Sequence, residues 1–220
     1  NRKVYFVNGQ VGIRGYSGNA AVVAFTPAQP AQVPRFVTYH QDSNRLFAGR
    51  GTTGAQNRVY FSDINSFESW PANNYFDIPE SRMGDIVTGF ARLFGNLVIF
   101  GERTISMLYG RVPSDFRLRT IEWENGCSYP YSIVEYAGYI LYARTSGVYK
   151  FDGSGPAQKI SDPIDAQFPG DAVGTLSGVL TEEFGPVATQ TSEGHYLLSY
   201  KSLTKNTSNH VRHNDQEMMA

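Results

Sequence analysis

Three aspartates in the first half of the chain have the side-chain type and the turn-rich surroundings from which hydrolytic chemistry can be built. Glycoside hydrolysis needs two carboxyl groups flanking the scissile bond, one as acid and the other as base or nucleophile. Asp63, Asp77 and Asp85 supply three carboxylates, but no spacing fixes any two of them at a useful separation. Aspartate in a turn commonly accepts hydrogen bonds from its own backbone. We therefore interpret these residues as structural and predict no catalytic residue.

The four histidines do not form a metal-binding pattern. His210 and His213 lie close together with Asp215 nearby, whereas a zinc site needs three or four ligands in fixed geometry. These residues belong to a polar C-terminal stretch. His40 and His195 are isolated, and ordinary surface or packing roles are expected for them. The sequence therefore predicts no metal and no other cofactor.

The single cysteine and the glycine-rich segments do not form a reactive site either. Cys127 has no histidine at a spacing that suggests a nucleophile pair, and free cysteine is usually a small buried hydrophobe. Segments 17–23 and 49–54 are rich in glycine. The first lacks the lysine of a phosphate loop, and the second lacks the helix that follows one. This pattern favours a structural or binding protein over an enzyme.

The composition predicts an all-β protein that does not bind nucleic acid. The 220 residues include 22 glycines and 11 prolines, and 14% are aromatic. Tyrosine and phenylalanine favour strands, whereas glycine and proline mark turns. A net charge of −1 lacks the basic excess of a nucleic-acid-binding surface. No apolar run approaches the roughly 20 residues that span a bilayer. Because the chain opens at Asn1 on a strand-like segment, we expect a fragment or a processed product.

Short strand patterns follow one another along the chain, and no helical pattern is convincing. A glycine-rich turn is expected at 12–18 and an extended linker at 26–34. Residues 1–202 are predicted to form the folded domain, and 203–220 a polar, flexible tail. Apolar runs bounded by turn residues predict strands at 3–9, 19–25, 35–40, 45–49, 58–63, 76–79, 86–96, 116–123, 132–138 and 195–200.

Two hairpins of nearly the same shape indicate a repeated architecture. Residues 95–110 and 138–153 each place two apolar runs around a polar turn. Related hairpins start at Asn44 and Gly194, so successive units lie 51, 43 and 56 residues apart. Repeats of roughly 40 to 50 residues with four short strands are typical of β-propeller blades. We therefore predict a β-propeller-like fold of repeated four-stranded antiparallel sheets, with a β-sandwich as the alternative.

Aromatic residues and one turn motif are interpreted as parts of this scaffold. Trp70, Trp123 and the many tyrosines could stack on sugar rings, but we expect them to fill the interfaces between blades. Segment 62–70 is similar to the Asp-box hairpin of sialidase-type propellers. Ser66, however, stands where that motif has glycine, and Trp70 falls late. Such a hairpin stabilises a blade and does not catalyse.

Four segments occur in a set order between about Asn44 and Asp165. They are NRVYFSDINSFESWPANNYFDIPES, GDIVTGFARLFGNLVIFGERTISMLYG, GCSYPYSIVEYAGYILYARTSGVYKFDG and KISDPID. Together they resemble phage virion propeller proteins. The turn Gly-Glu-Arg-Thr at 101–104 stands where that family has Lys-Glu-Arg-Ser, and the region after residue 200 does not match.

The resemblance implies a structural component of a phage tail or head–tail junction, of the nozzle or hub type. Such a protein is made in the host cytoplasm and built into the virion as several copies around the tail axis. Its partners are other virion proteins, namely portal, adaptor and tail fibre, with no membrane and no sequence-specific nucleic acid. Loops carry function on rigid scaffolds, and the contact residues we expect are Arg50, Thr52, Thr53, Gln56, Glu102 and Arg103.

Two other functions are compatible with a propeller. A glycan-binding or glycan-hydrolysing tail part would have a pocket lined by aromatic residues and two carboxylates. A cellular protein-interaction propeller ranks last, because the sequence lacks the Trp-Asp and kelch signatures.

Overall fold

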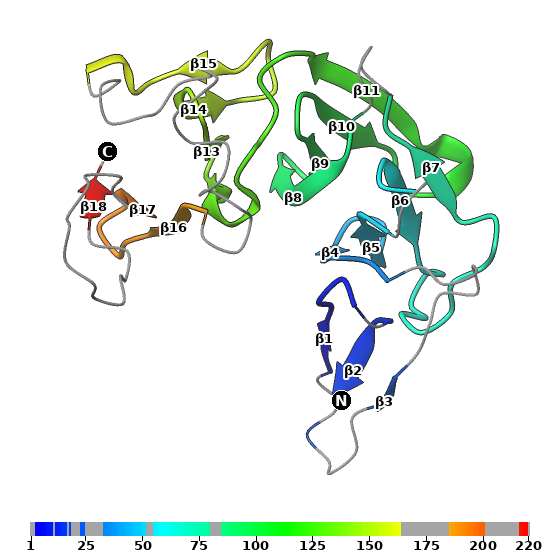
Figure 1. Ribbon diagram of the computed structural model, residues 1–220. Coiled ribbons are helices and arrows are strands. Elements are labelled where there is room, and N and C mark those ends of the chain that lie inside the picture. The colour runs from blue at the N-terminus through cyan, green and yellow to red at the C-terminus, as the bar shows by residue number, and fades with distance from the viewer. Residues whose placement is uncertain are drawn as a thin grey trace. The chain divides into compact units, whose positions relative to one another are not determined.

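The computed structural model describes residues 3–10, 12–16, 18, 23–24, 33–51, 55–79, 85–163, 185–200 and 216–219. The chain divides into two units, Asn1–Gly126 (unit 1) and Cys127–Ala220 (unit 2) (Figure 1). Within every sheet, strands that follow one another in sequence pair antiparallel. Each sheet is therefore an up-and-down meander, which needs only short local connections.

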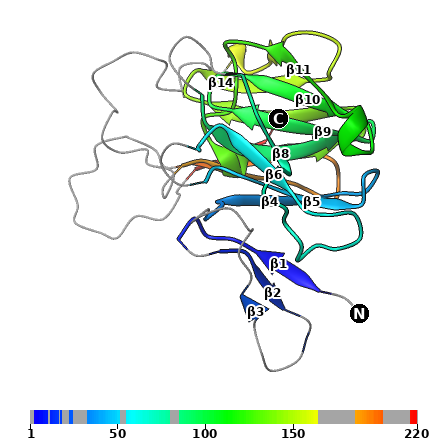
Figure 2. The same cartoon turned by 90° about the vertical axis from the view of Figure 1, so that its right-hand side faces the viewer.

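Unit 1 contains three sheets, and Figure 2 shows the strands β8 to β11 side by side. The first sheet consists of β1 (Val4–Phe6), β2 (Arg14–Tyr16) and β3 (Val23–Ala24). The second consists of β4 (Phe36–His40), β5 (Arg45–Gly49), β6 (Arg58–Phe61) and β7 (Tyr75–Asp77). The third consists of β8 (Val87–Leu93), β9 (Asn96–Gly101), β10 (Ile105–Tyr109) and β11 (Arg117–Glu122), with a 3-10 turn, η1 (Pro113–Asp115), before β11.

Unit 2 contains two sheets. The 3-10 turn η2 (Pro130–Ser132) precedes a sheet of β12 (Val134–Tyr136), β13 (Tyr139–Arg144), β14 (Gly147–Phe151) and β15 (Gln158–Lys159). The other sheet consists of β16 (Val187–Gln190), β17 (Tyr196–Tyr200) and β18 (Gln216–Met219). Of the tail expected at 203–220, the structure describes only the four residues of β18, which pair with β17.

The repeated hairpin of the sequence is the pair of second and third strands in four of the five described sheets. The hairpins that start near Gly95 and Gly138 are β9–β10 and β13–β14, and those near Asn44 and Gly194 supply β5–β6 and β17–β18. The described strands form five separate sheets, rather than the two sheets of a sandwich. The prediction of repeated four-stranded antiparallel sheets is confirmed for the three central ones.

One local expectation is wrong. The glycine-rich segment 12–18 was expected to be a turn, but it contains β2, which pairs with β1 on one side and β3 on the other. Ile13 is fully buried directly before this strand. Because the neighbouring strands satisfy the backbone of β2, the intrinsic turn preference of its glycines is overridden.

The larger buried cluster of unit 1 lies between the second and third sheets, and a second cluster contains Ile13 and Trp70. Leu97 and Ile99 point to one face of β9, and Leu108 stands on the same face of β10, opposite Leu97. They form one buried cluster with Phe47 of β5 and Phe61 of β6, whose rings lie 5.8 Å apart. Alternate residues of these strands therefore hold the second and third sheets of unit 1 together through apolar burial.

Unit 2 has its own core, closed by a tyrosine. Tyr196 of β17 is 1% exposed, and its hydroxyl donates a 2.8 Å hydrogen bond to the Ser132 carbonyl at the end of η2. Burial raises the pKa of Tyr196, so the phenol stays a donor. Leu141 and Val148 belong to the same buried cluster. This hydrogen bond ties the last sheet to the turn that opens unit 2.

In the described part of the chain, no helix is both long enough and apolar enough to cross a membrane.

Replacing Ile99 with alanine is expected to lower the free energy of unfolding by about 2–5 kcal/mol, because it opens a cavity in the unit 1 core. Ile64→Ala is the matched control. Ile64 is 50% exposed, so its loss is expected to stay within about 0.5 kcal/mol. Denaturant unfolding followed by tryptophan fluorescence measures both changes, since Trp70 and Trp123 belong to unit 1. Equal destabilisation by the two substitutions would contradict this assignment of the core.

Candidate interaction surface

Two of the expected contact loops lie at the same end of the unit 1 sheets. One connects β5 to β6 and contains Gln56, and the other connects β9 to β10 and contains Glu102. The Val87 amide donates to the Gln56 carbonyl at 2.9 Å, and the Glu102 amide donates to the Ile86 carbonyl at 3.0 Å. The start of β8 thus joins two loops that are far apart in the sequence.

The carboxylate of Asp85 organises this end of the sheet. It is 4% exposed, and its Oδ1 accepts hydrogen bonds from the amides of Ile86 at 2.9 Å and Arg103 at 3.2 Å. Its Oδ2 accepts from the amide of Thr104 at 3.0 Å and from the Thr104 hydroxyl at 2.5 Å. Four donors from two segments therefore converge on one buried anion, which would be costly to bury without them.

Two glycines let the backbone approach this carboxylate closely. A side chain on Gly101 would overlap the Asp85 carboxylate, and one on Gly126 would overlap the Gly101 carbonyl. The Gly126 amide donates to the Arg103 carbonyl at 2.8 Å. The 101–104 turn is thus held by Asp85 and by Gly126, while the side chains of Glu102 and Arg103 are exposed.

The other expected contact residues differ in their exposure. Gln56 is exposed, whereas Arg50 is half-buried with its backbone in the left-handed region, at a φ of 58°. The Arg50 carbonyl also accepts a 3.3 Å hydrogen bond from the Arg35 amide. Thr52 and Thr53 lie outside the described residues. Of the expected contact residues that the structure describes, Gln56, Glu102 and Arg103 are the solvent-facing ones.

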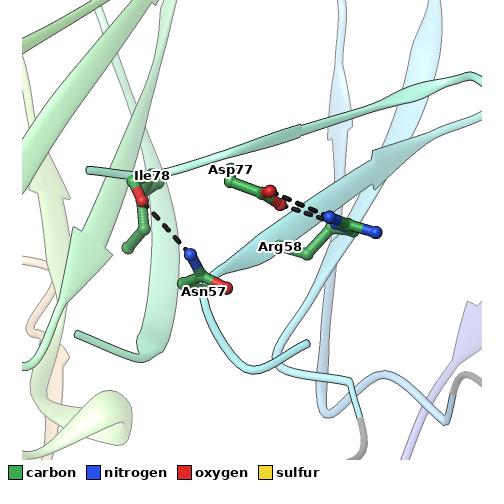
Figure 3. A network of polar contacts seen from close by, with 4 residues as sticks. All are labelled: Asn57, Arg58, Asp77 and Ile78. Atoms are coloured by element: carbon green, nitrogen blue, oxygen red, sulfur yellow. Dashed lines mark hydrogen bonds and ion pairs between the residues drawn. The ribbon is translucent and has the colours of Figure 1, made fainter. Parts of the chain in front are cut away.

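Asp77, the second carboxylate considered for hydrolysis, forms an ion pair across two strands (Figure 3). Its oxygens accept from Nε and Nη2 of Arg58 at 2.6 and 2.9 Å, a bidentate geometry. The guanidinium also lies over the Tyr75 ring, 3.9 Å from its centroid. Hydrogen bonding to Asp77 raises the pKa of Arg58 further above its usual value. Next to the pair, the Asn57 amide group donates to the Ile78 carbonyl at 3.5 Å.

Asp63 likewise has a structural role, in the hairpin that is similar to an Asp-box. Its carboxylate accepts from the Ser69 hydroxyl at 2.7 Å and from the Asn74 side chain at 3.3 Å. Trp70, at the end of the motif, is 4% exposed, and its indole donates to the Phe67 carbonyl at 2.9 Å. All three candidate carboxylates are therefore engaged by protein groups in unit 1.

The described histidines have separate roles. His40 is 2% exposed, with Nδ1 2.9 Å from the Ser43 hydroxyl and Nε2 2.7 Å from the Gly95 carbonyl. A neutral ring that donates from Nε2 and accepts at Nδ1 satisfies both contacts. His195 is exposed and lies 3.7 Å from Glu193. His210, His213 and Asp215 lie outside the described residues. Among the residues that the structure describes, no group of three or more His, Cys, Asp or Glu could hold a metal ion.

The two tryptophans differ in environment. Trp70 packs in the core as expected, but Trp123 is 52% exposed, so the expectation that it fills an interface within the chain is wrong. The preceding residue, Glu122, is buried and was not singled out by the sequence. Its Oε1 accepts from the amides of Trp123, Glu124 and Asn125 at 2.9, 2.9 and 3.1 Å. This cap fixes the backbone at the end of β11.

No protein-family model matches the chain, and no curated protein sequence is significantly similar to it. Its fold is similar to virginiamycin B lyase from Staphylococcus aureus, with a TM-score of 0.57 and 11% identity over 92% of this chain and 64% of that one. A streptogramin B lyase matches with a TM-score of 0.52 and 13% identity over 89% of this chain and 58% of that one. The WD40 β-propeller domain of Doa1 matches with a TM-score of 0.53 and 11% identity over 92% of this chain and 62% of that one.

These likenesses define the class of the protein. Its repeated antiparallel sheets and its similarity to solved propellers assign it a β-propeller-type fold, which confirms the fold prediction. The chain spans less than two thirds of the length of each of the three matched structures. At such low sequence identity the similarity is one of fold, and propellers serve many functions.

Asp85→Asn is expected to destabilise the chain by about 1–3 kcal/mol, because an amide nitrogen would then face backbone donors that need an acceptor. Asp115→Asn, an exposed aspartate of unit 1, is the control and is expected to change stability by less than about 0.5 kcal/mol. Denaturant unfolding measures both variants. A neutral Asp85→Asn would show that the carboxylate does not hold the turn.

Cys127 is expected to be chemically inert in the folded chain. It is fully buried, its Sγ donates to the Tyr129 carbonyl at 3.2 Å, and burial raises the pKa of the thiol to about 12. At pH 8 only roughly one thiol in 10⁴ is then ionised, and access is blocked as well. We expect no reaction with a thiol-specific dye before unfolding and one equivalent after it. Ser154→Cys, at an exposed position, is the positive control, and native Cys127 reacting at a similar rate would contradict the expectation.

Proposed function

We propose that the chain is a structural component of a phage tail or head–tail junction, of the nozzle or hub type. It acts by assembly, presenting rigid loops to neighbouring virion proteins rather than converting a substrate. The ordered segments between about Asn44 and Asp165 support this proposal through their resemblance to virion propellers. The observation that carries it is the anchored turn at 101–104, which exposes an acidic and a basic side chain on a fixed backbone.

A fixed turn is suited to assembly for a thermodynamic reason. Association costs the conformational freedom of every loop that becomes ordered at the interface. The backbone of Glu102 and Arg103 is already constrained in the free chain by the Ile86 carbonyl, Asp85 and Gly126. Docking through this turn therefore orders little more than two side chains, and their opposite charges set the register of the partner.

The proposal includes the partners and the place of action. The chain contacts portal, adaptor and tail-fibre proteins, and several copies surround the tail axis in the virion after synthesis in the host cytoplasm. Copies related by rotation about an axis use a heterologous interface, in which two different patches of one subunit meet. In this proposal the anchored turn is one such patch.

Catalysis is the competing function, since two of the similar folds are by their names a virginiamycin B lyase and a streptogramin B lyase. Incubating the chain with virginiamycin B and following the substrate by mass spectrometry tests it directly. Glycan hydrolysis has less support, because Asp63, Asp77 and Asp85 are all engaged by structural hydrogen bonds or ion pairs. Turnover in either assay would replace the assembly proposal with an enzymatic one.

Peptide mass spectrometry of gradient-purified virus particles tests the assembly proposal. Recovery of this chain at a fixed ratio to the portal protein is the expected result. Peptides that remain in the soluble lysate and never sediment with particles would overturn the proposal.

Reversing the charges of the anchored turn, Glu102→Lys with Arg103→Glu, is expected to lower incorporation into particles at least about tenfold. A loss of about 1.4 kcal/mol of binding free energy per contact corresponds to a tenfold loss of affinity. Arg119→Glu with Asp115→Lys is the matched control, because both residues are exposed on β11 and on the turn before it, outside the 101–104 turn. Equal incorporation of both double variants would show that the turn is not a contact.

A further inference from the structure

A hollow of about 330 Å³ lies on unit 1 between β1 and the 62–70 hairpin. Its volume falls at the small end of known ligand sites, roughly 300–1,000 Å³. Its lining comes from two places in the sequence and combines aromatic rings with polar groups: Lys3, Tyr5, Asn65, Ser66, Phe67 and Glu68. None of these residues belongs to the anchored turn at 101–104.

The apolar wall of the hollow is held in place. The Tyr5 ring meets the Phe67 ring edge-on, with centroids 6.0 Å apart and planes at 85°. Tyr39 packs against the same Phe67 ring at 5.5 Å and 73°. Tyr5 and Phe67 also pack on the buried cluster that contains Trp70. Edge-to-face contacts fix ring orientation, so the wall is formed before any ligand arrives.

The polar rim of the hollow carries no net charge. The ammonium of Lys3 lies 2.6 Å from Oε1 of Glu68, and both side chains are partly exposed. Asn65 has its backbone in the left-handed region, and its backbone N–H donates to the backbone carbonyl of Asn44 at 3.1 Å. The Asn44 amide group also donates to the Asn65 side-chain oxygen, which leaves the Asn65 NH₂ directed away from that contact. Ser66 adds an exposed hydroxyl.

We propose that this hollow binds a neutral saccharide ring. A sugar presents C–H bonds on one face and hydroxyl groups around its edge. The Tyr5 and Phe67 rings match the first, while the Asn65 amide, the Ser66 hydroxyl and the Lys3–Glu68 pair match the second. A phosphate or another charged ligand fits less well, because it would have to separate Lys3 from Glu68. The proposed chemistry is binding only, since Glu68 is the one carboxylate among the described residues of the lining and hydrolysis requires two.

This inference does not depend on the assembly proposal, because the hollow and the anchored turn share no residue. The β6–β7 connection, which contains Asn65 to Glu68, and the β5–β6 loop lie at opposite ends of one meander sheet. One end of unit 1 is thus available for assembly while the other holds a ligand.

Saturation-transfer NMR on the full chain tests the site, with glucose, galactose, N-acetylglucosamine and rhamnose as separate probes. We expect transfer to the ring C–H protons of at least one of these sugars. Phe67→Leu keeps apolar packing but removes the aromatic face, and it is expected to weaken binding about tenfold. Tyr16→Leu is the matched control, since Tyr16 is an exposed aromatic residue of β2 that does not line the hollow.

A second variant keeps the test decisive if Phe67→Leu fails to fold. Asn65→Gly removes one polar group at a position whose φ of 57° suits glycine, and it is expected to weaken binding several-fold with an unchanged tryptophan spectrum. Absence of transfer with all four sugars overturns the proposal. So does transfer that is undiminished in the folded variant, because the sugar would then be bound elsewhere. Particle incorporation is measured separately, so failure of this site and failure of the assembly role are distinguishable.

Discussion

The end of unit 1 that carries the 101–104 turn depends on one constraint. The buried carboxylate of Asp85 needs hydrogen-bond donors around it. Asp85 cannot remain charged and 4% exposed unless donors surround it. Three of its four hydrogen bonds come from the backbone amides of Ile86, Arg103 and Thr104, and the fourth comes from the Thr104 hydroxyl. The entry to β8 and the β9–β10 turn are therefore positioned together. Gly101 and Gly126 follow from the same requirement, since any larger side chain would occupy the space that the bonds need.

Polar side chains also anchor several other connections. Asp63 holds the 62–70 hairpin, Glu122 caps the end of β11, and His40 bonds the turn after β8. In unit 2, the Ser132 hydroxyl accepts from the Ala143 amide at 2.8 Å, which links η2 to β13. Backbone pairing within a meander is generic and does not specify its connections. Buried polar side chains supply that specificity, because each has few arrangements in which it is fully bonded.

Apolar residues between the sheets and polar residues at the connections therefore have different roles. Apolar residues of neighbouring sheets, such as Phe47 and Leu97, supply most of the burial that holds unit 1 together. The anchored connections fix the backbone, so exposed side chains such as Glu102 lie on a backbone that would lose little conformational freedom on binding. Opposite ends of the sheets are thus compatible with the two roles that we propose, assembly through the anchored turn and sugar binding at the hollow beside Phe67.

The sequence by itself determined most of the strands, the hairpin repeat and the fold class, although it did not single out β15, β16 or β18. Alternating apolar residues and turn-forming glycines act over a few neighbours, so their effect at 95–110 and 138–153 can be read locally. It failed at β2, where pairing with two neighbouring strands overrides the turn preference of a glycine-rich segment. Only the tertiary structure decided what the polar residues do. Asp85 meets Thr104, His40 meets Gly95 and Phe67 meets Tyr5, and no local pattern encodes these partners. Such pairings depend on the register and packing of whole sheets. For that reason Asp85 can be considered for catalysis from the sequence, and only the fold shows that it anchors a turn.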